Sequence, residues 1–326
     1  MDERGRFAPS PTGELHLGNA RTALLAWLWS RSAGGEFVLR IEDLDLPRCK
    51  PGLGERQLEE LRWLGLDWEQ GPSADPPHHD AGARGPYRQS QRGRLYEAAL
   101  EALGEGGHLY ECFCSRAQIR AAAGAAQASE ASAPQGPQDE GPRYPGTCAR
   151  LSPEEVASRR KTQKPSLRLR VPPGPIDFVD LIAGPQRFDP GAEAGDFILR
   201  RADGLFAYQL AVVIDDAAMG ITQVLRGADL LASTARQLIL YQLLGLRAPA
   251  FAHAPLLFGA PGPDGIPQRL SKRAGAETLS TLRERGEDPF RIVAGLARSC
   301  GLVDESVTRC APAELVPTFS LARLAA

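Results

Sequence analysis

Hydrophobic and polar positions in the first 65 residues follow the order strand, loop, helix, strand, helix. Ala20, Leu24, Trp27 and Leu28 recur at helical spacing, and residues around Leu58 repeat this pattern. Between the two helices the apolar run FVLRI is typical of a buried strand. The pattern therefore predicts, in order, a strand at 4–8, a helix at 19–31, a strand at 37–41 and a helix at 54–64. This order favours a parallel α/β unit.

The rest of the chain alternates in the same way around an interruption. Residues 204–215 form a strongly apolar, buried segment, and a helix over 233–244 has Ser233 as its N-cap candidate and Gly245 as its stop. Further predicted elements are a helix at 90–104, β-rich structure at 166–190, a strand at 224–226 and a helix at 290–297. Because α/β character returns after the interruption, we predict one nucleotide-binding domain split by an inserted domain.

The predicted fold is thus α/β, with a Rossmann-type domain, an α+β insertion and a short helical C-terminal extension. Residues 121–142 contain no large apolar side chain, so they predict a helical start that decays into a mobile loop. The expected units are residues 1–105 (first half), 106–192 (insertion), 193–258 (second half) and 259–326 (a basic loop and helical tail).

Composition narrows the class of protein only modestly. The formal net charge of −2 gives no global positive field for nucleic acid, although a local basic surface is compatible with it. No leader-like start and no apolar run of about 18 residues occurs, so we expect a cytoplasmic protein without a membrane span. Nothing suggests an assembly surface, so we expect a monomer.

The segment GELHLGN at residues 13–19 lies between a predicted strand and a predicted helix. Ligands of open α/β sheets bind at this edge, and a helix N-terminus offers backbone N–H groups to phosphate. Gly18 allows close approach of a nucleotide, and His16 can donate to phosphate oxygens. A histidine and a glycine in a loop are, on their own, more often structural.

The segment RLSKR at residues 269–273 follows a turn rich in glycine and proline. Three cations around Ser271 could follow phosphate charge as a transition state develops. The alternative is a solvated basic loop. Lys272 is one of only four lysines, the others being Lys50, Lys161 and Lys164, which favours a specific role.

Together these segments resemble the two signatures of class I aminoacyl-tRNA synthetases. The sequences RFAPSPTG at 6–13, RIEDLD at 40–45 and LRGADL at 225–230 are similar to the glutamate-specific branch of that family. The resemblance covers roughly residues 4–290 and implies that ATP activates glutamate as glutamyl-adenylate, with Mg²⁺ bridging phosphate oxygens.

The resemblance also implies a set of site residues. Glutamate carries two carboxylates and one ammonium, and arginine binds a carboxylate through two parallel hydrogen bonds. Glu42 is expected to take the ammonium, although capping of a strand end is an alternative role for Glu42 and Asp43. The implied glutamate-binding residues are Arg6, Phe7, Ala8, Pro9, Ser10, Glu42, Tyr208 and Arg226. The implied ATP-binding residues are His16, Gly18, Asn19, Ser271 and Lys272, with His16 and Lys272 catalytic.

A separate cluster of cysteines predicts a metal site. Cys112, Cys114 and Cys148 supply three soft thiolates, which suit one tetrahedral, structural zinc ion completed by oxygen or nitrogen. The resemblance implies Tyr144 as the fourth ligand, and His108 is an alternative. The cysteines could also be present without metal.

The acceptor of glutamate is the least direct of these predictions. Only 53 residues follow Arg273, so we expect no anticodon-binding domain. With the cysteines, this resembles a shortened relative of the glutamate enzyme, which implies transfer to queuosine at the first anticodon position of tRNA(Asp). Two alternatives are a truncated enzyme that charges a tRNA 3′ end and a non-catalytic tRNA-binding regulator.

Overall fold

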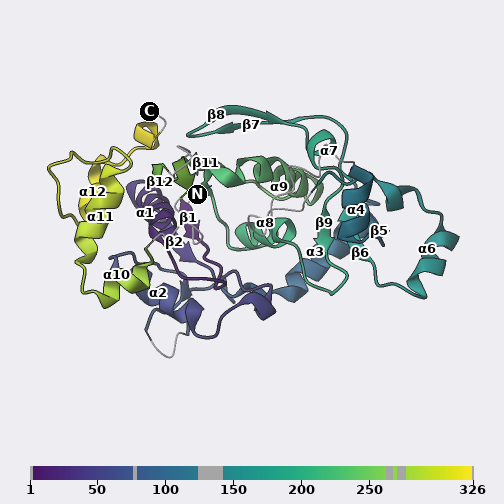
Figure 1. Cartoon of the computed structure of the whole chain (residues 1–326), viewed down its shortest axis with the longest axis horizontal. Helices are drawn as coiled ribbons and strands as arrows, with labels where there is room; N and C mark the ends of the chain where they lie inside the picture. Colours follow the sequence, from purple (N-terminus) through teal and green to yellow (C-terminus); the bar gives the residue numbers. More distant parts are fainter. Residues whose placement is uncertain (1–2, 76–78, 124–141, 262–266, 270–276, 325–326) are drawn as a thin grey trace.

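The computed structural model describes residues 3–75, 79–123, 142–261, 267–269 and 277–324 (Figure 1). The predicted loop beyond residue 123 and the site residues Ser271 and Lys272 lie outside the described residues. In the part of the chain that is described, no helix is long and apolar enough to cross a membrane.

A four-stranded sheet lies at the centre of the molecule, in the order β11-β10-β1-β2. All three neighbouring pairs in this sheet are parallel. The strands are β1 (Arg4–Phe7), β2 (Glu36–Leu39), β10 (Gln223–Gly227) and β11 (Ala250–Ala254). More than 180 residues separate β2 from β10, so the sheet joins the two predicted halves, and the α/β prediction is confirmed.

Helices cover both faces of this sheet because successive strand residues point to opposite faces. Phe37 and Leu39 belong to a core with α1 (Leu17–Ser32), whereas Val38 between them packs on the other side. That second core contains α8 (Tyr208–Ala218), α9 (Leu231–Leu243) and α3 (Gly93–Glu105). The near-continuous apolar run of β2 thus reflects burial on both faces.

Two segments flank the first half of the sheet. Helix α2 (Leu53–Trp63) contributes Leu58 and Leu61 to the core around α1. Helices α10 (Leu279–Glu284), α11 (Pro289–Arg298) and α12 (Pro312–Leu315) form the C-terminal part, and α11 and α12 contact α1 (Figure 1). The predicted helix at 290–297 is therefore present.

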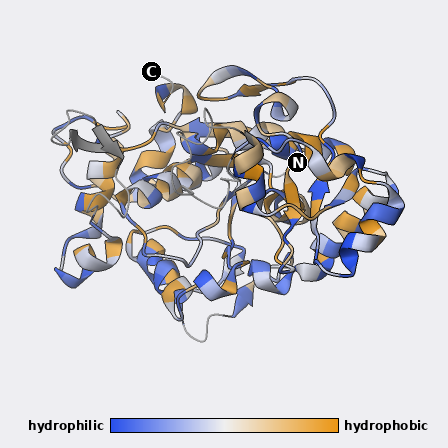
Figure 2. Cartoon of the chain, turned by 45° about the vertical axis from the view of Figure 1, so that its right-hand side comes forward, coloured by the Kyte–Doolittle hydropathy of each residue, from blue (hydrophilic) through white to orange (hydrophobic). Residues whose placement is uncertain are grey.

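The insertion between α3 and α8 forms the far end of the molecule from α11 and α12 (Figure 1). Its antiparallel sheet has the order β5-β6-β9, from β5 (Leu109–Cys112), β6 (Ser166–Leu169) and β9 (Ile198–Arg200). Helices α4 (Arg116–Ala123) and α6 (Pro153–Arg160) lie beside it, and α6 has no buried residue and is mainly hydrophilic (Figure 2). Helix α7 (Pro190–Glu193) follows a hairpin of β7 (Ile176–Asp180) and β8 (Gly184–Phe188), and β7 packs on α9 and β11.

Three details differ from the sequence predictions or add to them. Ser233 is not an N-cap, because α9 begins two residues earlier with Leu230 as its cap, and the Ser233 side chain is buried against Gln209. Strand β9 lies after the boundary expected at residue 192, yet pairs with β6, so the sheet of the insertion extends to Arg200. The apolar segment at 204–215 becomes helix α8 from residue 208 onward.

Candidate active site

Four of the predicted glutamate-binding side chains meet at the carboxyl edge of the parallel sheet. Arg6 lies on β1, Arg226 on β10, Glu42 just beyond β2, and Tyr208 at the first turn of α8. Because all these strands run in one direction, their carboxyl ends share an edge, where open α/β sheets bind ligands. Both arginines are buried, at 5% and 4% exposure.

The segment from Phe7 to Ser10 runs along this edge beside the end of β2. The Phe7 carbonyl accepts a hydrogen bond from Arg40 N at 3.1 Å, and the Pro9 carbonyl accepts from Glu42 N at 2.9 Å. The Ser10 carbonyl accepts from the Gln57 side chain at 3.2 Å. These bonds fix the backbone of residues 7–10, including Ala8, against the strand that leads to Glu42.

The four side chains share one electrostatic environment. Burial raises the pKa of Glu42, while the charges of Arg40 and Arg6 oppose this effect. Burial also raises the pKa of Tyr208 and lowers that of Arg226, and each of these two groups influences the other. We call these four side chains the candidate glutamate pocket. Their two buried guanidinium groups and one carboxylate can pair with a ligand that carries the opposite set of charges.

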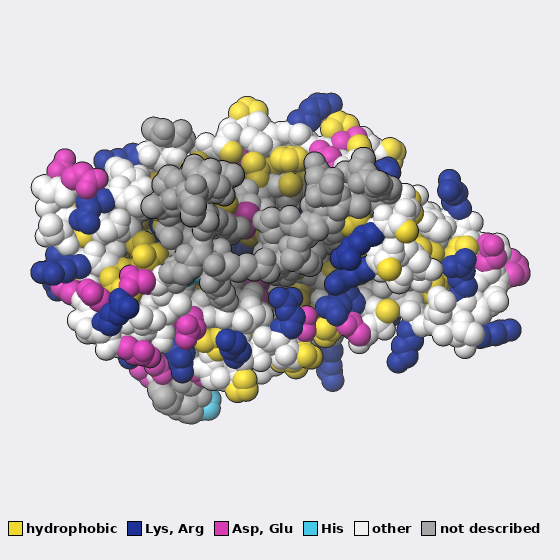
Figure 3. Space-filling view, in the orientation of Figure 1, with side chains coloured by type: hydrophobic (Ala, Val, Ile, Leu, Met, Phe, Trp, Pro, Cys, Tyr) yellow, Lys and Arg dark blue, Asp and Glu magenta, His cyan; other side chains and the backbone are white. Residues whose placement is uncertain are grey.

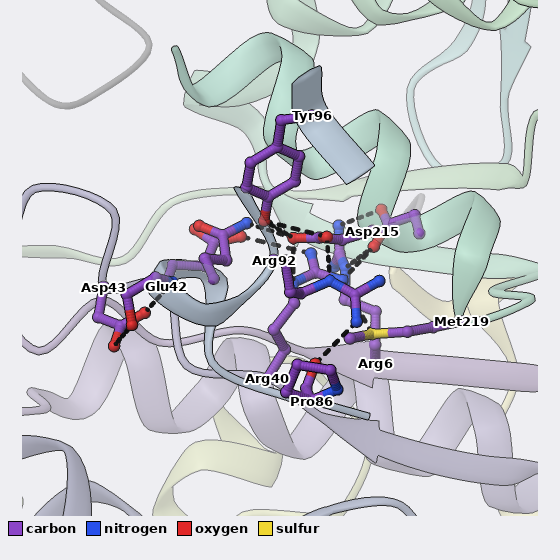
Figure 4. Close-up of polar contacts among 12 residues, drawn as sticks. Arg6, Arg40, Glu42, Asp43, Pro86, Arg92, Tyr96, Asp215 and Met219 are labelled. Carbon is purple, nitrogen blue, oxygen red and sulfur yellow. Dashed lines mark hydrogen bonds and ion pairs between the residues drawn. The ribbon is translucent and has the colours of Figure 1, made fainter. Parts of the chain in front are cut away.

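Sequence reasoning missed the buried ion pairs that hold these side chains (Figure 4). Asp216 of α8 accepts from Arg6 at 3.4 Å and from Arg40 Nη1 at 2.7 Å. Arg40 is fully buried, and its Nη2 lies 3.4 Å from Glu42 Oε1. Burial disfavours the charge of Arg40, but Asp216, Asp215 and Glu42 outweigh it and raise its pKa. Arg40 and Asp216 therefore link the cationic and anionic sides of the pocket.

A second layer surrounds Asp215, which is also fully buried. Its carboxylate accepts from Arg92, from Gln89 Nε2 at 2.7 Å and from the Tyr96 hydroxyl at 2.9 Å (Figure 4). The sequence does carry a sign of these ion pairs: two consecutive acids, Asp215 and Asp216, stand where the apolar run GLFAYQLAVVID ends. Asp43, in contrast, binds Ser90 through both carboxylate oxygens, at 2.8 and 2.7 Å, which supports the local structural role considered for it.

The predicted ATP residues of the first motif form the N-terminus of α1. His16 is the N-cap: its Nδ1 accepts from Gly18 N at 3.1 Å, and its own N–H donates to Asn19 Oδ1 at 3.2 Å. No acidic residue occupies the first turn, so the positive end of the helix dipole is not neutralised there.

The chain that follows the second motif lies directly against the first. Thr278 forms an antiparallel bridge with His16, and Leu279 N donates to the Leu15 carbonyl at 2.8 Å. Thr278 then caps α10 through Thr281 N. The described chain that follows the second motif is thus attached beside the first motif, at the same end of the sheet.

The predicted metal ligands converge in a small core within the insertion. The Sγ atoms of Cys112, Cys114 and Cys148 all lie within 4.8 Å of one another. The Tyr144 hydroxyl lies 3.4 Å from Cys112 Sγ and 3.7 Å from Cys114 Sγ, and the latter is 3.5 Å from Cys148 Sγ. Zn–S bonds of 2.3 Å at tetrahedral angles place ligand atoms about 3.8 Å apart, so this set fits a zinc ion. His108 is absent from the group, and its ring lies against Gly106 instead.

The ionised form of this cluster depends on a nearby cation. Burial raises the pKa of the Cys114 thiol to about 11, which indicates that a nearby cation is needed to keep it ionised. Gly195, with a φ of +69°, lies so close to the Tyr144 carbonyl that an added Cβ would be 2.5 Å away. Arg168 stacks over the Tyr144 ring at 3.9 Å. The tyrosine is therefore held firmly from two sides.

The chain matches one protein family and several known proteins over most of its length. The family model described as tRNA synthetases class I (E and Q), catalytic domain, matches residues 4–323. The chain is 56% identical over 321 residues to the glutamyl-Q tRNA(Asp) synthetase of Symbiobacterium thermophilum, covering 98% of this chain and 93% of that protein. It is 46% identical to the protein of the same name from Nitratidesulfovibrio vulgaris, again covering 98% and 93%. The crystal structure of glutamate-tRNA synthetase from Elizabethkingia anophelis superimposes with a TM-score of 0.81 at 30% identity, covering 99% of this chain and 67% of that one.

Proposed function

Because the chain belongs to the class I tRNA synthetases of the E and Q group, we propose that it forms glutamyl-adenylate from L-glutamate and ATP without tRNA. It is a ligase-type enzyme that activates glutamate and modifies tRNA. The observation that carries the proposal is that Arg6, Arg226 and Glu42 lie together at one sheet edge. Two guanidinium groups match the two carboxylates of glutamate, and Glu42 matches its ammonium.

In the activation step a glutamate carboxylate attacks the α-phosphate of ATP, and pyrophosphate leaves. The N-terminus of α1, with Gly18 and Asn19, supports this assignment because the positive end of the helix dipole, which has no acidic residue in its first turn, favours phosphate. In this assignment His16, Ser271 and Lys272 also contact ATP, and Lys272 follows the charge on the leaving group. Mg²⁺ bound with ATP would neutralise phosphate oxygens.

In the second step, as we propose it, glutamate passes to queuosine at the first anticodon position of tRNA(Asp). The similarity to two proteins named glutamyl-Q tRNA(Asp) synthetase, each matched over 93% of its length, supports this acceptor. The insertion as a whole, 106–200, is nearly neutral, with twelve Lys and Arg against eleven Asp and Glu. Within it, residues 142–170 carry eight Lys and Arg against two Glu, and this basic segment supports tRNA as the partner. Basic side chains gather at that end of the molecule in Figure 3.

We also assign one structural zinc ion to Cys112, Cys114, Tyr144 and Cys148. The distances among their ligand atoms support this assignment. With all four positions taken by protein atoms, such an ion would brace β5 and the segment around Cys148 rather than take part in the reaction.

The decisive experiment supplies labelled glutamate and ATP with four RNAs: tRNA(Asp) with and without queuosine, and tRNA(Glu) with and without its 3′ adenosine. We expect label only on queuosine-containing tRNA(Asp). Label on intact tRNA(Glu) alone would support the charging of a 3′ end, the activity named for the Elizabethkingia protein. Failure of glutamate to promote ATP–pyrophosphate exchange would reject activation itself and favour a non-catalytic tRNA-binding protein.

A further inference from the structure

A buried chain of three polar side chains ends at Arg226. Arg226 and His253 are direct neighbours on the parallel strands β10 and β11, and Asp180 reaches His253 from the hairpin of the insertion. Each of the three residues is at most 4% exposed. Two of these residues, Asp180 and His253, have no part in the function proposed above, although burying them is costly unless they are fully bonded.

The hydrogen bonds of Asp180 fix the protonation of the imidazole. Its Oδ1 accepts from the backbone N–H groups of Ile182 at 3.0 Å, Ala183 at 2.8 Å and His253 at 3.1 Å. Its Oδ2 lies 2.6 Å from His253 Nδ1. An ionised carboxylate only accepts, so Nδ1 carries the proton.

The other imidazole nitrogen faces Arg226, which only donates, and the Thr234 hydroxyl at 3.3 Å, which can donate or accept. Arg226 Nε lies 2.9 Å from His253 Nε2, so Nε2 must be the unprotonated acceptor. Burial lowers the pKa of His253, while Asp180 opposes this effect, and a neutral imidazole agrees with both contacts. Asp180 and Arg226 therefore require the same tautomer.

This arrangement leaves one edge of the Arg226 guanidinium for a ligand. Nε donates to His253 Nε2, and Nη2 donates to Thr234 Oγ1 at 2.8 Å and to the Leu230 carbonyl at 3.4 Å. Nη1 is buried and has no hydrogen-bond partner among the described residues. A buried guanidinium nitrogen without a partner is costly, which indicates that a bound anion completes it.

We propose that Asp180 and His253 are positioning residues that orient Arg226 so that its Nη1 binds a carboxylate of the amino-acid substrate. The inference rests on the proposed glutamate pocket. It adds that the inserted region, through Asp180 on β7, sets substrate affinity from outside the sheet.

The test is calorimetric titration of the full chain with L-glutamate, with ATP titrated separately. Asp180→Asn keeps Oδ1 for the three backbone bonds but places an amide N–H against Nδ1. The imidazole then exposes an N–H to Arg226 Nε, and the guanidinium must turn. We expect glutamate Kd to rise about 10- to 100-fold, the value of one or two charge-assisted bonds, while ATP Kd stays the same. Asp177→Asn is the control, because Asp177 lies on the same strand in an exposed pair with Arg187.

A second variant separates positioning from simple destabilisation. His253→Gln can present an amide oxygen to Arg226 Nε, so we expect glutamate Kd within about 3-fold of the parent's. On that background Asp180→Asn should add less than about 3-fold, since its effect passes through the imidazole. Thermal unfolding of each variant shows whether it is folded.

An unchanged glutamate Kd in folded Asp180→Asn would overturn the proposal. Equal losses of glutamate and ATP affinity would also overturn it, since they indicate general disorder of the site. Should Asp180→Asn not fold, a glutamate Kd more than 10-fold weaker in His253→Gln would contradict the role of the imidazole as an acceptor. Failure of the pocket assignment itself is seen earlier, in a parent protein that does not bind glutamate.

Discussion

Replacement of Asp216 by asparagine tests the buried charge network below the candidate glutamate pocket. The Asp216 carboxylate lies 2.7 Å from Arg40 and 3.4 Å from Arg6, and all three side chains are at most 6% exposed. The change keeps the shape of the side chain and removes its charge. Arg40 retains Glu42 at 3.4 Å and Asp215 at 3.7 Å, whereas Arg6 loses its only ion pair among the described residues.

The expected loss of stability follows from that uneven compensation. Removing one partner of a buried ion pair costs about 3–5 kcal/mol of stability. Because Glu42 and Asp215 still compensate the charge of Arg40, we expect a loss at the lower end, about 3 kcal/mol. For a chain of 326 residues the entropy of unfolding is about 0.7 kcal/mol per kelvin. The melting temperature should therefore fall by about 4 °C.

The pH dependence gives an independent check. Burial disfavours the charge of Asp216, but Arg6 and Arg40 outweigh it and hold the pKa of this carboxyl below its usual value. Its contribution is therefore complete above the unfolded pKa of about 4 and is lost as the pH falls through the lower folded value. The difference between parent and variant should be full at pH 7 and shrink below about pH 4.

Differential scanning calorimetry at several pH values makes both measurements. The matched control is Asp177→Asn, which breaks an ion pair whose two side chains are more than 60% exposed and should shift stability by less than about 0.5 kcal/mol. If Asp216→Asn melts within about 1 °C of the parent at pH 7, the buried network does not stabilise the fold as argued.

Three further outcomes are expected. The carboxylate oxygens of Glu60 are buried and have no hydrogen-bond partner in the described part of the chain. Burial raises the pKa of Glu60 to about 7, so its stabilising contribution is complete below about pH 4.5 and lost as the pH rises through 7. Glu60→Met should then raise the melting temperature by about 2 to 4 °C at pH 8 and much less at pH 5, and an equal gain at both would contradict this reasoning. Cys148→Ser should purify without zinc, measured by metal analysis, and Gly195→Ala should retain less of it by displacing Tyr144; a parent without zinc would reject the site. Lys272→Ala should abolish ATP–pyrophosphate exchange while calorimetric glutamate binding is kept, and unchanged exchange would remove Lys272 from the mechanism.

The sequence predicted three of the four strands of the parallel sheet because their signals are local, whereas β11 was not predicted. The apolar run before Glu42 and the helical spacing of Leu24 and Leu28 depend on residues within one or two turns of each other, and β2 and α1 lie where expected. The ends of elements were less certain. Leu230 is the N-cap of helix α9, although serine is chemically the better capping residue. The Ser233 side chain is instead buried and accepts a hydrogen bond from Gln209, a contact that the sequence does not reveal.

The pocket residues Arg6, Glu42, Tyr208 and Arg226 could be proposed from the sequence because they belong to short motifs that resemble a known family. The metal ligands could be proposed because cysteine is rare in this chain and its chemistry is narrow. In both cases the type of residue carries the signal, and the distances between segments are not needed.

The partners of these residues were decided by the tertiary structure alone. Asp216 meets Arg40 across 176 positions, and Asp180 meets His253 across 73. An aspartate in sequence has the same appearance whether it is exposed, as Asp177 is, or holds a histidine in one tautomer, as Asp180 does three residues later. Which of the two occurs depends on the strand that the chain packs against, because burial and the geometry of a neighbouring donor set the charge and the role of a carboxylate.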